Sequence, residues 1–516
     1  MLKYKNALCF VFIFFLFAGL HAQDKKLSLT LEECVTKAMR NNLNVAIEVL
    51  NPELSDISIS LAREQFLPTL SFNYNIQDRE EPSFSLIEVA GSIQADYNDW
   101  SGSITQRIPT GADFTISLAS YRRASNIKYQ TFNPRYTSIL QFDFTQPLLK
   151  NFGPKISRRE IIVAKNNMEI SENDFKTILM GTIYDVESAY WNLVYSLEDL
   201  KAKKQSLDWA QNFLAKNKRE VEVGTLAPIE ILSAESEVAT READILQAEA
   251  EVKNREDELK TVINLVSEEG GMDVEVIPVD KPDFTEKEIS LEEALQMALE
   301  NRPDLQRIKA DINNRKIDLT YAKNQLLPEL NLIASYWSPG IGGTEILYDP
   351  DDPLGDPIGS IPGGAMESFK DAFNFKFRNW SVRLSFSVPL NTMFSRAQQA
   401  QARTELNQTR LRLKNQEQQV ILEVKTTVRT VQTNYKRVQA YRAARALAEK
   451  TLEAEEKKLK VGLTTHYTVL QHQRDLANAI SAELRAVIDY NLSLAQLDRA
   501  MGVSLKNKNI EFSIFE

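Results

Sequence analysis

Two long stretches of the chain place hydrophobic residues alternately three and four positions apart, the spacing that lets one α-helix pack along another at a shallow angle. The first stretch lies within residues 155–222 and the second within residues 394–460. The apolar positions in the two stretches are Ile183, Val186, Tyr190, Leu193, Leu197 and Leu200, and Ile421, Val424, Val428, Val431, Tyr435 and Val438. The pattern predicts two helices of about 68 residues, each roughly 100 Å long.

Two other zones, residues 68–147 and 328–389, show the second regular pattern, in which hydrophobic and polar residues alternate one by one. Phe72 and Tyr74 alternate with serine and asparagine in the first zone, and Phe386 alternates with serine in the second. Such a strand has one face suited to lipid and one suited to water. A soluble sandwich could show the same alternation, but strands set between long helices, with nothing to cover a second sheet, favour a membrane sheet.

The alternating zones predict about four strands per chain. Four strands cannot close a membrane barrel, because the smallest use about 8, so several chains must contribute, and three would give about 12. A candidate extra hairpin near residues 100–121 flanks the turn Pro109-Thr110-Gly111. Two placements are open: the hairpin joins the barrel, or it caps the barrel. Residues 338–364 are rich in Gly, Pro and Asp and predict a long exposed loop.

The two patterns belong to a duplicated half. The segment LEECVTKAMRNN that begins at Leu31 returns as LEEALQMALENR at Leu291, and the later segments repeat in the same order. A repeat of this length is a domain-sized half rather than a solenoid unit. The expected divisions are a first half at 23–269, a linker at 270–289, a second half at 290–504 and a tail at 505–516.

Each half is expected to contain, in order, a helix, strands, a long helix, a glycine turn and a further helix. The opening helices are predicted over residues 31–66 and 291–326, and the closing helices over residues 226–266 and 464–501. A break in the first opening helix is expected at Asn51-Pro52. Because the apolar seam of the long helices is narrow, they must pack laterally against other helices, and oligomerisation would supply these neighbours.

The first 22 residues, 1–22, are predicted to be a secretory signal peptide. Lys3 and Lys5 precede an apolar stretch, which is followed by a small-residue cleavage signal ending at Ala22. The remaining chain is expected to begin near Gln23 and to leave the cytoplasm. No later run of about 20 apolar residues predicts a transmembrane helix.

Composition and motifs exclude several classes of function. The formal net charge is −10, so electrostatic attraction to nucleic acid or to anionic lipid is not expected. Cys34 is the only cysteine after the signal, and we expect a buried small hydrophobe and no intrachain disulfide. The sequence has no phosphate-binding glycine loop, no HExxH and no paired CxxC, so no enzyme activity, cofactor or metal site is expected. His466 and His472 are interpreted as solvated residues near a helix turn.

Paired Leu-Pro and Pro-Leu signals bracket the strand zones at Leu67-Pro68, Pro147-Leu148, Leu327-Pro328 and Pro389-Leu390, and a Val-Gly turn follows each long helix. These features occur in the same order in both halves. Together they resemble the TolC family of outer-membrane efflux channels over nearly the whole mature chain. The resemblance implies a homotrimer with a barrel of about 12 strands in the outer-membrane lipid and a helical tunnel in the periplasm of a Gram-negative bacterium. It also implies a periplasmic adaptor (membrane fusion) protein and an inner-membrane pump of RND, ABC or MFS type.

The same resemblance gives roles to the ends of the long helices. The adaptor-docking tips are expected at Val223-Gly224-Thr225 and Val461-Gly462-Leu463. Alignment on these turns places Glu230 at the acidic gate position of the first half, whereas Thr468 and Gln471 stand where family members carry aspartates. Glu230, repeated three times, is therefore the candidate for a negative ring at the pore entrance. The alternative is an exposed carboxylate favoured by the helix dipole.

The sequence therefore predicts a mainly α-helical chain with a membrane β region, acting as the passive, gated exit duct of a tripartite efflux or type I secretion system. The alternative is a structural or adhesive trimeric outer-membrane stalk, but an adhesin would carry its bulk outside the cell, and the strand-connecting loops here are modest. A periplasmic adaptor would have one helical hairpin between β-rich modules, which the duplicated long helices argue against. The transported substrate and the identity of the pump do not follow from the sequence.

Overall fold

The computed structural model describes residues 26–84, 91–267, 273–287 and 289–510. These residues form two compact units. The helical unit comprises residues 26–47, 178–300 and 422–510, and the strand unit comprises residues 48–177 and 301–421. The predicted signal peptide and the last six residues of the predicted tail lie outside the described residues.

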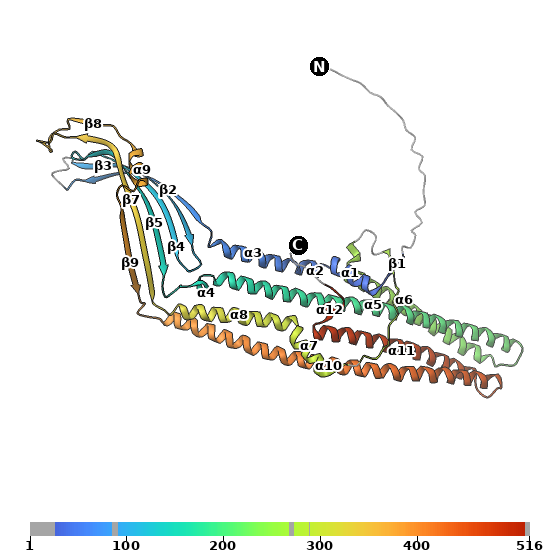
Figure 1. The fold of residues 1–516 in the computed structure, drawn as a ribbon. Helices are drawn as coiled ribbons and strands as arrows, with labels where there is room; N and C mark the ends of the chain where they lie inside the picture. The colour runs from blue at the N-terminus through green and yellow to red at the C-terminus, as the bar shows by residue number, and fades with distance from the viewer. Residues whose placement is uncertain (1–25, 85–90, 268–272, 288, 511–516) are drawn as a thin grey trace, which may run out of the picture. The chain divides into compact units, whose positions relative to one another are not determined.

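The strand unit is built on one antiparallel sheet of seven strands (Figure 1). In spatial order the strands are β2 (Thr69–Pro82), β3 (Ser92–Arg107), β4 (Asp113–Ser125), β5 (Phe132–Pro147), β7 (Glu329–Leu347) and β8 (Gly359–Ile361), with β9 (Asn379–Ser387) pairing with β7. Six of the seven strands have nine or more residues. The expectation of about four strands is therefore too low.

The additional strands come from the candidate hairpin near residues 100–121. It forms β3 and β4, which lie hydrogen-bonded between β2 and β5, so the hairpin is part of the sheet. Its alternation is hard to recognise in sequence because Gly102 and Asn98 interrupt the hydrophobic positions of β3. The predicted loop 338–364 is also wrong in part, because β7 continues through Leu347.

The strand register divides the sheet into two chemically different faces. We call one the apolar face; its members include Leu70, Phe72, Tyr74, Ile76, Trp100, Ile104, Ile116, Leu118, Leu140, Phe142, Tyr336, Trp380, Val382, Leu384 and Phe386. We call the other the polar face; its members include Ser71, Asn73, Ser101, Ser103, Thr115, Ser117, Gln141, Asp143, Ser335, Ser381, Arg383 and Ser385. The predicted alternation therefore holds along most of the sheet, with exceptions such as Trp337 on the polar face and Ser138 on the apolar face.

The opening helices are divided differently from the prediction. The first consists of α1 (Leu31–Asn41), α2 (Leu43–Glu48) and α3 (Leu50–Glu64), with no break at Asn51-Pro52. Pro52 instead lies in the first turn of α3, where its missing N–H costs no helical hydrogen bond. The second consists of α7 (Leu291–Asn301) and α8 (Pro303–Asn324), which are interrupted directly before a proline.

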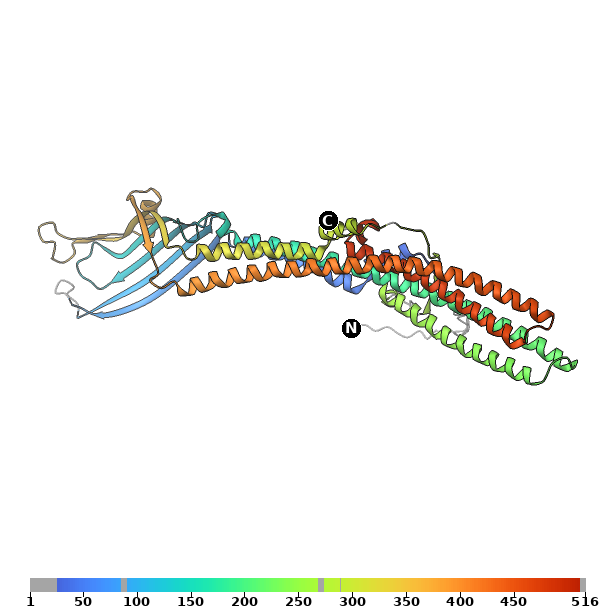
Figure 2. The same cartoon turned by 90° about the horizontal axis from the view of Figure 1, so that it is seen from below.

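The long helices follow the prediction closely. After the short α4 (Pro154–Ser157), α5 spans Arg159–Glu222, and α10 spans Met393–Lys460. In the helical unit each is followed by an antiparallel partner, α6 (Ile229–Val262) and α11 (His466–Met501) (Figure 2). The remaining helices are α9 (Ala365–Phe373), the 3₁₀ turn η2 (Leu265–Ser267) and α12 (Ser504–Asn507). None of the helices within the described residues combines the length and the hydrophobicity that crossing a membrane requires.

The core of the helical unit is built on the predicted seam. Ile183, Val186, Tyr190 and Leu193 of α5 are at most 2% exposed and pack in one cluster with Cys34 of α1. The hydroxyl of Tyr190 donates to the carboxylate of Asp280 at 3.0 Å, next to the parallel pair of β1 (Lys26–Leu29) and β6 (Glu275–Pro278). Cys34 is free and fully buried, as predicted, and burial raises the pKa of its thiol to about 12.

Candidate functional site

The helical unit presents two turns that have the same backbone geometry. Helix α5 ends at Glu222 and α10 at Lys460. The glycine two residues beyond each end has a positive φ, +79° at Gly224 and +74° at Gly462. Glycine adopts this left-handed conformation without the steric cost that a Cβ would add, so it can reverse the chain directly after a helix.

Hydrogen bonds complete the motif in both turns. The N–H of Thr225 donates to the carbonyl of Glu220 at 2.9 Å, and the N–H of Leu463 donates to the carbonyl of Lys458 at 3.0 Å. In addition, each turn glycine donates its own N–H to a carbonyl three residues earlier. These bonds form the Schellman motif, which satisfies the last carbonyl groups of a helix.

The turns carry exposed hydrophobic side chains. Val223 is 74% exposed, Val461 is 69% exposed and Leu463 is 76% exposed. The first turn thus exposes one apolar side chain at its tip and the second exposes two.

The three predicted gate residues lie in or just after the first turns of the closing helices. Glu230 is half-buried in the first turn of α6, where the positive end of the helix dipole favours a carboxylate. Thr468 belongs to the cap of α11, because its N–H donates to Thr465 Oγ1 at 3.3 Å and the two hydroxyl oxygens lie 2.8 Å apart. Gln471 is exposed further along α11. Of the three, only Glu230 is charged.

His466 is not a solvated residue as the sequence suggested. Its ring lies 5.1 Å from the ring of Phe213, and its Nε2 lies 3.3 Å from a carboxylate oxygen of Glu220. Burial lowers the pKa of His466, although Glu220 and Glu230 oppose this effect and Lys216 adds to it. The first residue of α11 therefore packs against the end of α5, which joins the two turns of one chain.

A buried arginine, which no motif in the sequence reveals, joins three helices of the helical unit. The guanidinium of Arg241 on α6 donates to the backbone carbonyls of Ser206 on α5 at 2.5 Å and of Leu470 on α11 at 3.3 Å. It also bonds Glu237 one turn earlier at 3.1 Å. Its side chain is only 5% exposed. A buried guanidinium whose donors reach two carbonyls and a carboxylate holds its neighbours in place, because separating them would leave a buried charge unpaired.

A signal for Arg241 exists in the sequence. The residues seven positions before and after it, Ala234 and Ala248, are both buried, so the arginine occupies the centre of a stripe of small residues. Small neighbours leave room for a guanidinium to reach across to other helices. A charged residue in the buried position of a heptad is uncommon and therefore informative.

These helices and α10 line an open cavity of about 470 Å³, with Arg241 in its wall. The lining is rich in charge, and the guanidinium of Arg485 donates to Asn192 at 3.0 Å and pairs with Asp489 at 2.9 Å. Ser481 on α11 donates to Asp199 on α5 at 2.6 Å. Hydrogen bonds and an ion pair therefore tie α11 to α5 and brace α11 itself next to the cavity.

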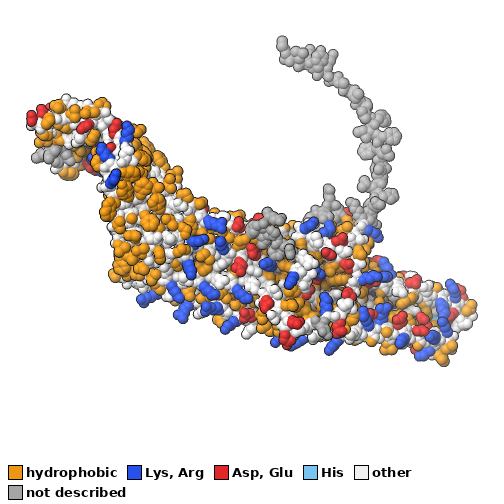
Figure 3. Space-filling view, in the orientation of Figure 1, with side chains coloured by type: hydrophobic (Ala, Val, Ile, Leu, Met, Phe, Trp, Pro, Cys, Tyr) orange, Lys and Arg blue, Asp and Glu red, His pale blue; other side chains and the backbone are white. Residues whose placement is uncertain are grey.

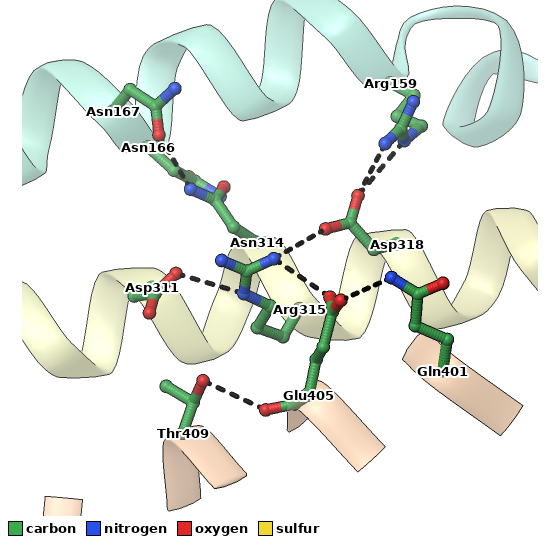
Figure 4. A network of polar contacts seen from close by, with 10 residues as sticks. All are labelled: Arg159, Asn166, Asn167, Asp311, Asn314, Arg315, Asp318, Gln401, Glu405 and Thr409. Carbon is green, nitrogen blue, oxygen red and sulfur yellow. Dashed lines mark hydrogen bonds and ion pairs between the residues drawn. The ribbon is translucent and has the colours of Figure 1, made fainter. Parts of the chain in front are cut away.

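Polar contacts also join the helices of the strand unit (Figure 4). Arg159 at the start of α5 pairs with Asp318 of α8 at 2.6 Å, and Arg315 of α8 pairs with Glu405 of α10 at 3.2 Å. Between them, buried Asn314 bonds two asparagines of α5. These bonds add to the buried hydrophobic contacts, such as those of Ile161 and Leu305, in holding the three helices in register.

Among the described residues, no three His, Cys, Asp or Glu side chains form a cluster that could hold a metal ion. The candidate site therefore consists of the two exposed turns, the first turn of α6 with its charged Glu230, and the buried Arg241 that joins three helices.

A family model described as outer membrane efflux protein matches residues 35–265 and 294–503 of the chain. No curated protein is similar enough in sequence to be matched.

Several solved structures share the fold over 92% of this chain. The outer membrane channel CmeC of Campylobacter jejuni has a TM-score of 0.61 and 14% identity, with 86% of its own length covered. The outer membrane protein VceC of Vibrio cholerae has a TM-score of 0.61 and 14% identity, with 96% covered. The MtrE outer membrane channel of Neisseria gonorrhoeae, solved in its open state, has a TM-score of 0.60 and 17% identity, with 89% covered.

Proposed function

The chain belongs to the outer membrane efflux protein family, and from this premise we propose that three copies form the exit duct of a tripartite efflux system. As a member of that family it is an efflux channel of the Gram-negative outer membrane. The proposal adds the number of chains, the closure of the sheet, the docking surface and the gate. The observation that carries it is a sheet with one apolar and one polar face and two open edges.

The open edges favour closure of the sheet by other copies of the chain. Within the described residues β2 pairs only with β3, and β9 pairs only with β7. Unpaired backbone N–H and C=O groups in lipid cost several kcal/mol each, so an open sheet edge is not tolerated in the hydrocarbon layer. Pairing β2 of one copy with β9 of the next would satisfy both edges.

The number of strands then differs from the number implied by the resemblance. Three copies with six long strands each give a barrel of about 18 strands instead of about 12. Barrels of about 16 to 18 strands enclose an aqueous channel, whereas small barrels are filled by side chains. The polar face would line this channel and the apolar face would contact lipid.

The helical units would form the tunnel, and their turns would dock the adaptor. Each chain supplies two turns of one geometry, so a trimer presents six similar tips in a ring. Exposed Val223, Val461 and Leu463 supply the apolar contacts, and an inner-membrane pump would supply the energy.

The gate would lie where the closing helices begin. Glu230 supplies negative charge to the entrance, and Thr468 and Gln471 supply uncharged polar groups. Arg241 holds α6 against α5 and α11, so opening by movement of α6 or α11 must break its bonds. In this proposal the chain conducts substrates and neither makes nor breaks a covalent bond in them.

The number of chains is tested by native mass spectrometry of the purified protein in mild detergent. We expect a complex of three chains, and a monomer that forms no pores would overturn the proposal. Adaptor docking is tested separately by calorimetry with the cognate adaptor. Val461→Asp should abolish binding, and the isosteric Val461→Thr should retain most of it.

A further inference from the structure

Helix α9 and the residues that follow it, through Arg378, form a segment that the channel function does not use. It lies on the apolar face of the sheet, against β5 and β7 (Figure 1). Its sequence, AMESFKDAFNFKFR, combines four phenylalanines and a methionine with three basic residues. We call residues 365–378 the outer-face segment.

The sheet is shaped to receive this helix. The hydroxyl groups of Ser138 on β5 and Ser368 on α9 lie 2.7 Å apart, and both residues are fully buried. A Cβ on Gly340 of β7 would lie 1.9 Å from the carbonyl oxygen of Ser368, so only glycine allows this approach. The ring of Phe369 stacks on Trp100 of β3 at 5.7 Å. The helix is therefore a fixed part of the strand unit.

The helix sits at one boundary of the hydrophobic band. Along β2 the apolar face is hydrophobic from Leu70 to Ile76 and then polar at Asp78, and the residues opposite Ile76 on β3 and β4, Asn98 and Arg122, are already polar. Gly340 is eleven residues from the start of β7. At about 3.3 Å per residue and a tilt near 45°, this corresponds to roughly 25 Å, the height of the apolar band of an outer-membrane barrel.

The outward side of the segment has the composition of a membrane interface. Met366, Phe373 and Phe377 are 63%, 53% and 45% exposed, and Lys370 and Arg378 are exposed beside them. Hydrophobic side chains dominate the surface of the strands in Figure 3. Aromatic residues with neighbouring lysine and arginine are enriched where a bilayer meets water.

Charge favours a phosphate-bearing partner. Within the segment Lys376 pairs with Asp371 at 2.9 Å. The other charged residues of the segment are Lys370, Arg378 and Glu367. Glu367 accepts a hydrogen bond from the N–H of Gly364 at 2.8 Å and remains the one other acidic residue of the segment. The segment is thus locally basic although the whole chain is acidic, and the local charge governs contact with a lipid headgroup.

We propose that the outer-face segment is an interfacial anchor that binds bilayer lipids with phosphate-bearing headgroups. Met366, Phe373 and Phe377 enter the acyl boundary, and Lys370 and Arg378 reach the phosphates. The proposal rests on the proposed function, in which the apolar face contacts the membrane, and it fixes the depth of the barrel in that membrane.

Depth is measured with bimane labels on single introduced cysteines of the full-length protein, reconstituted in phosphatidylcholine vesicles. The native Cys34 stays unlabelled because it is fully buried. We expect a label in Phe373→Cys to be quenched most by a nitroxide placed near the headgroup. A label in Leu384→Cys, on the apolar face, should be quenched by a nitroxide within the acyl chains and not by aqueous iodide, and a label in Ser385→Cys should be quenched by iodide.

These labels separate the two proposals. If the Leu384→Cys label is also quenched by iodide and not by lipid, the sheet is not in the membrane and the proposed function fails. If that label is in lipid but the Phe373→Cys label is quenched only by iodide, the channel stands and the anchor is refuted. A Phe373→Cys label that is shielded from both quenchers means that another protein copy covers the segment, which also refutes lipid binding.

The headgroup preference is measured with the same Phe373→Cys label and brominated phosphatidylglycerol in phosphatidylcholine vesicles. We expect phosphatidylglycerol to be bound in preference to phosphatidylcholine. Lys370→Gln and Arg378→Gln should each lower that preference up to about fivefold, without moving the Leu384→Cys label. An unchanged preference in the double variant would refute the role of the basic residues.

Discussion

Replacement of Arg241 by methionine tests whether the buried guanidinium holds α6 against α5 and α11. Methionine keeps the length of the side chain but removes the guanidinium, so the carbonyl of Leu470 and the carboxylate of Glu237 lose their partner. The carbonyl of Ser206 loses a bond of 2.5 Å. The packing of the aliphatic part is largely retained.

The magnitude follows from the three bonds. Hydrogen bonds to a charged group contribute about 1.5–3 kcal/mol each, and burial of the guanidinium costs part of this sum. We expect a net loss of about 2–3 kcal/mol in the free energy that holds α6 to α5 and α11. A loss of this size would raise the population of separated helices by roughly 30- to 150-fold, because about 1.4 kcal/mol is a factor of ten.

The assay is single-channel recording in planar bilayers, combined with thermal unfolding. Arg241→Met should raise the open probability and lower the unfolding temperature, and Arg241→Lys should fall between it and the native protein. The matched control is Arg474→Met, which removes an exposed arginine from the wall of the same cavity. If Arg241→Met behaves like Arg474→Met, Arg241 is not the tie that we describe.

Three further outcomes are expected. Gly224→Ala or Gly462→Ala places a Cβ at positive φ and should cost about 1–2 kcal/mol at that turn, measured by thermal unfolding and by a weaker adaptor affinity in calorimetry. Burial lowers the folded pKa of His466 below its ordinary 6.5, so the unfolded chain binds the proton first and stability should fall as the pH falls below 6.5. His466→Gln should reduce this pH dependence. The thiol of Cys34, with its pKa raised to about 12, should react with maleimide at pH 8 only after unfolding.

Periodicity predicted the long helices well because their burial depends on a local repeat. Val424, Val428 and Val431 of α10 are at most 3% exposed, as the seam requires. The Val-Gly pairs likewise predicted the turns, since a left-handed glycine after a helix is encoded locally. The roles of Val223, Glu230 and their neighbours in docking and gating stay predictions.

The features that sequence reasoning missed depend on contacts between distant segments. The ring of His466 is buried by Phe213, a residue on a different helix. Strand β3 is stabilised by pairing with β2 and β4, so its interrupted alternation gives a weak signal. Gly340 falls in the expected loop 338–364 because the need for glycine at this position arises only when α9 lies on the strand.

The central claim, a water-filled channel lined by the polar face, is tested most directly by modification of single cysteines during planar-bilayer recording. Ser385→Cys lies on the polar face of β9 and Leu384→Cys lies beside it on the apolar face. We expect a charged, water-soluble thiosulfonate to change the single-channel conductance of Ser385→Cys and to leave that of Leu384→Cys unchanged. Equal effects on the two variants, or a protein that forms no channels, would contradict the claim.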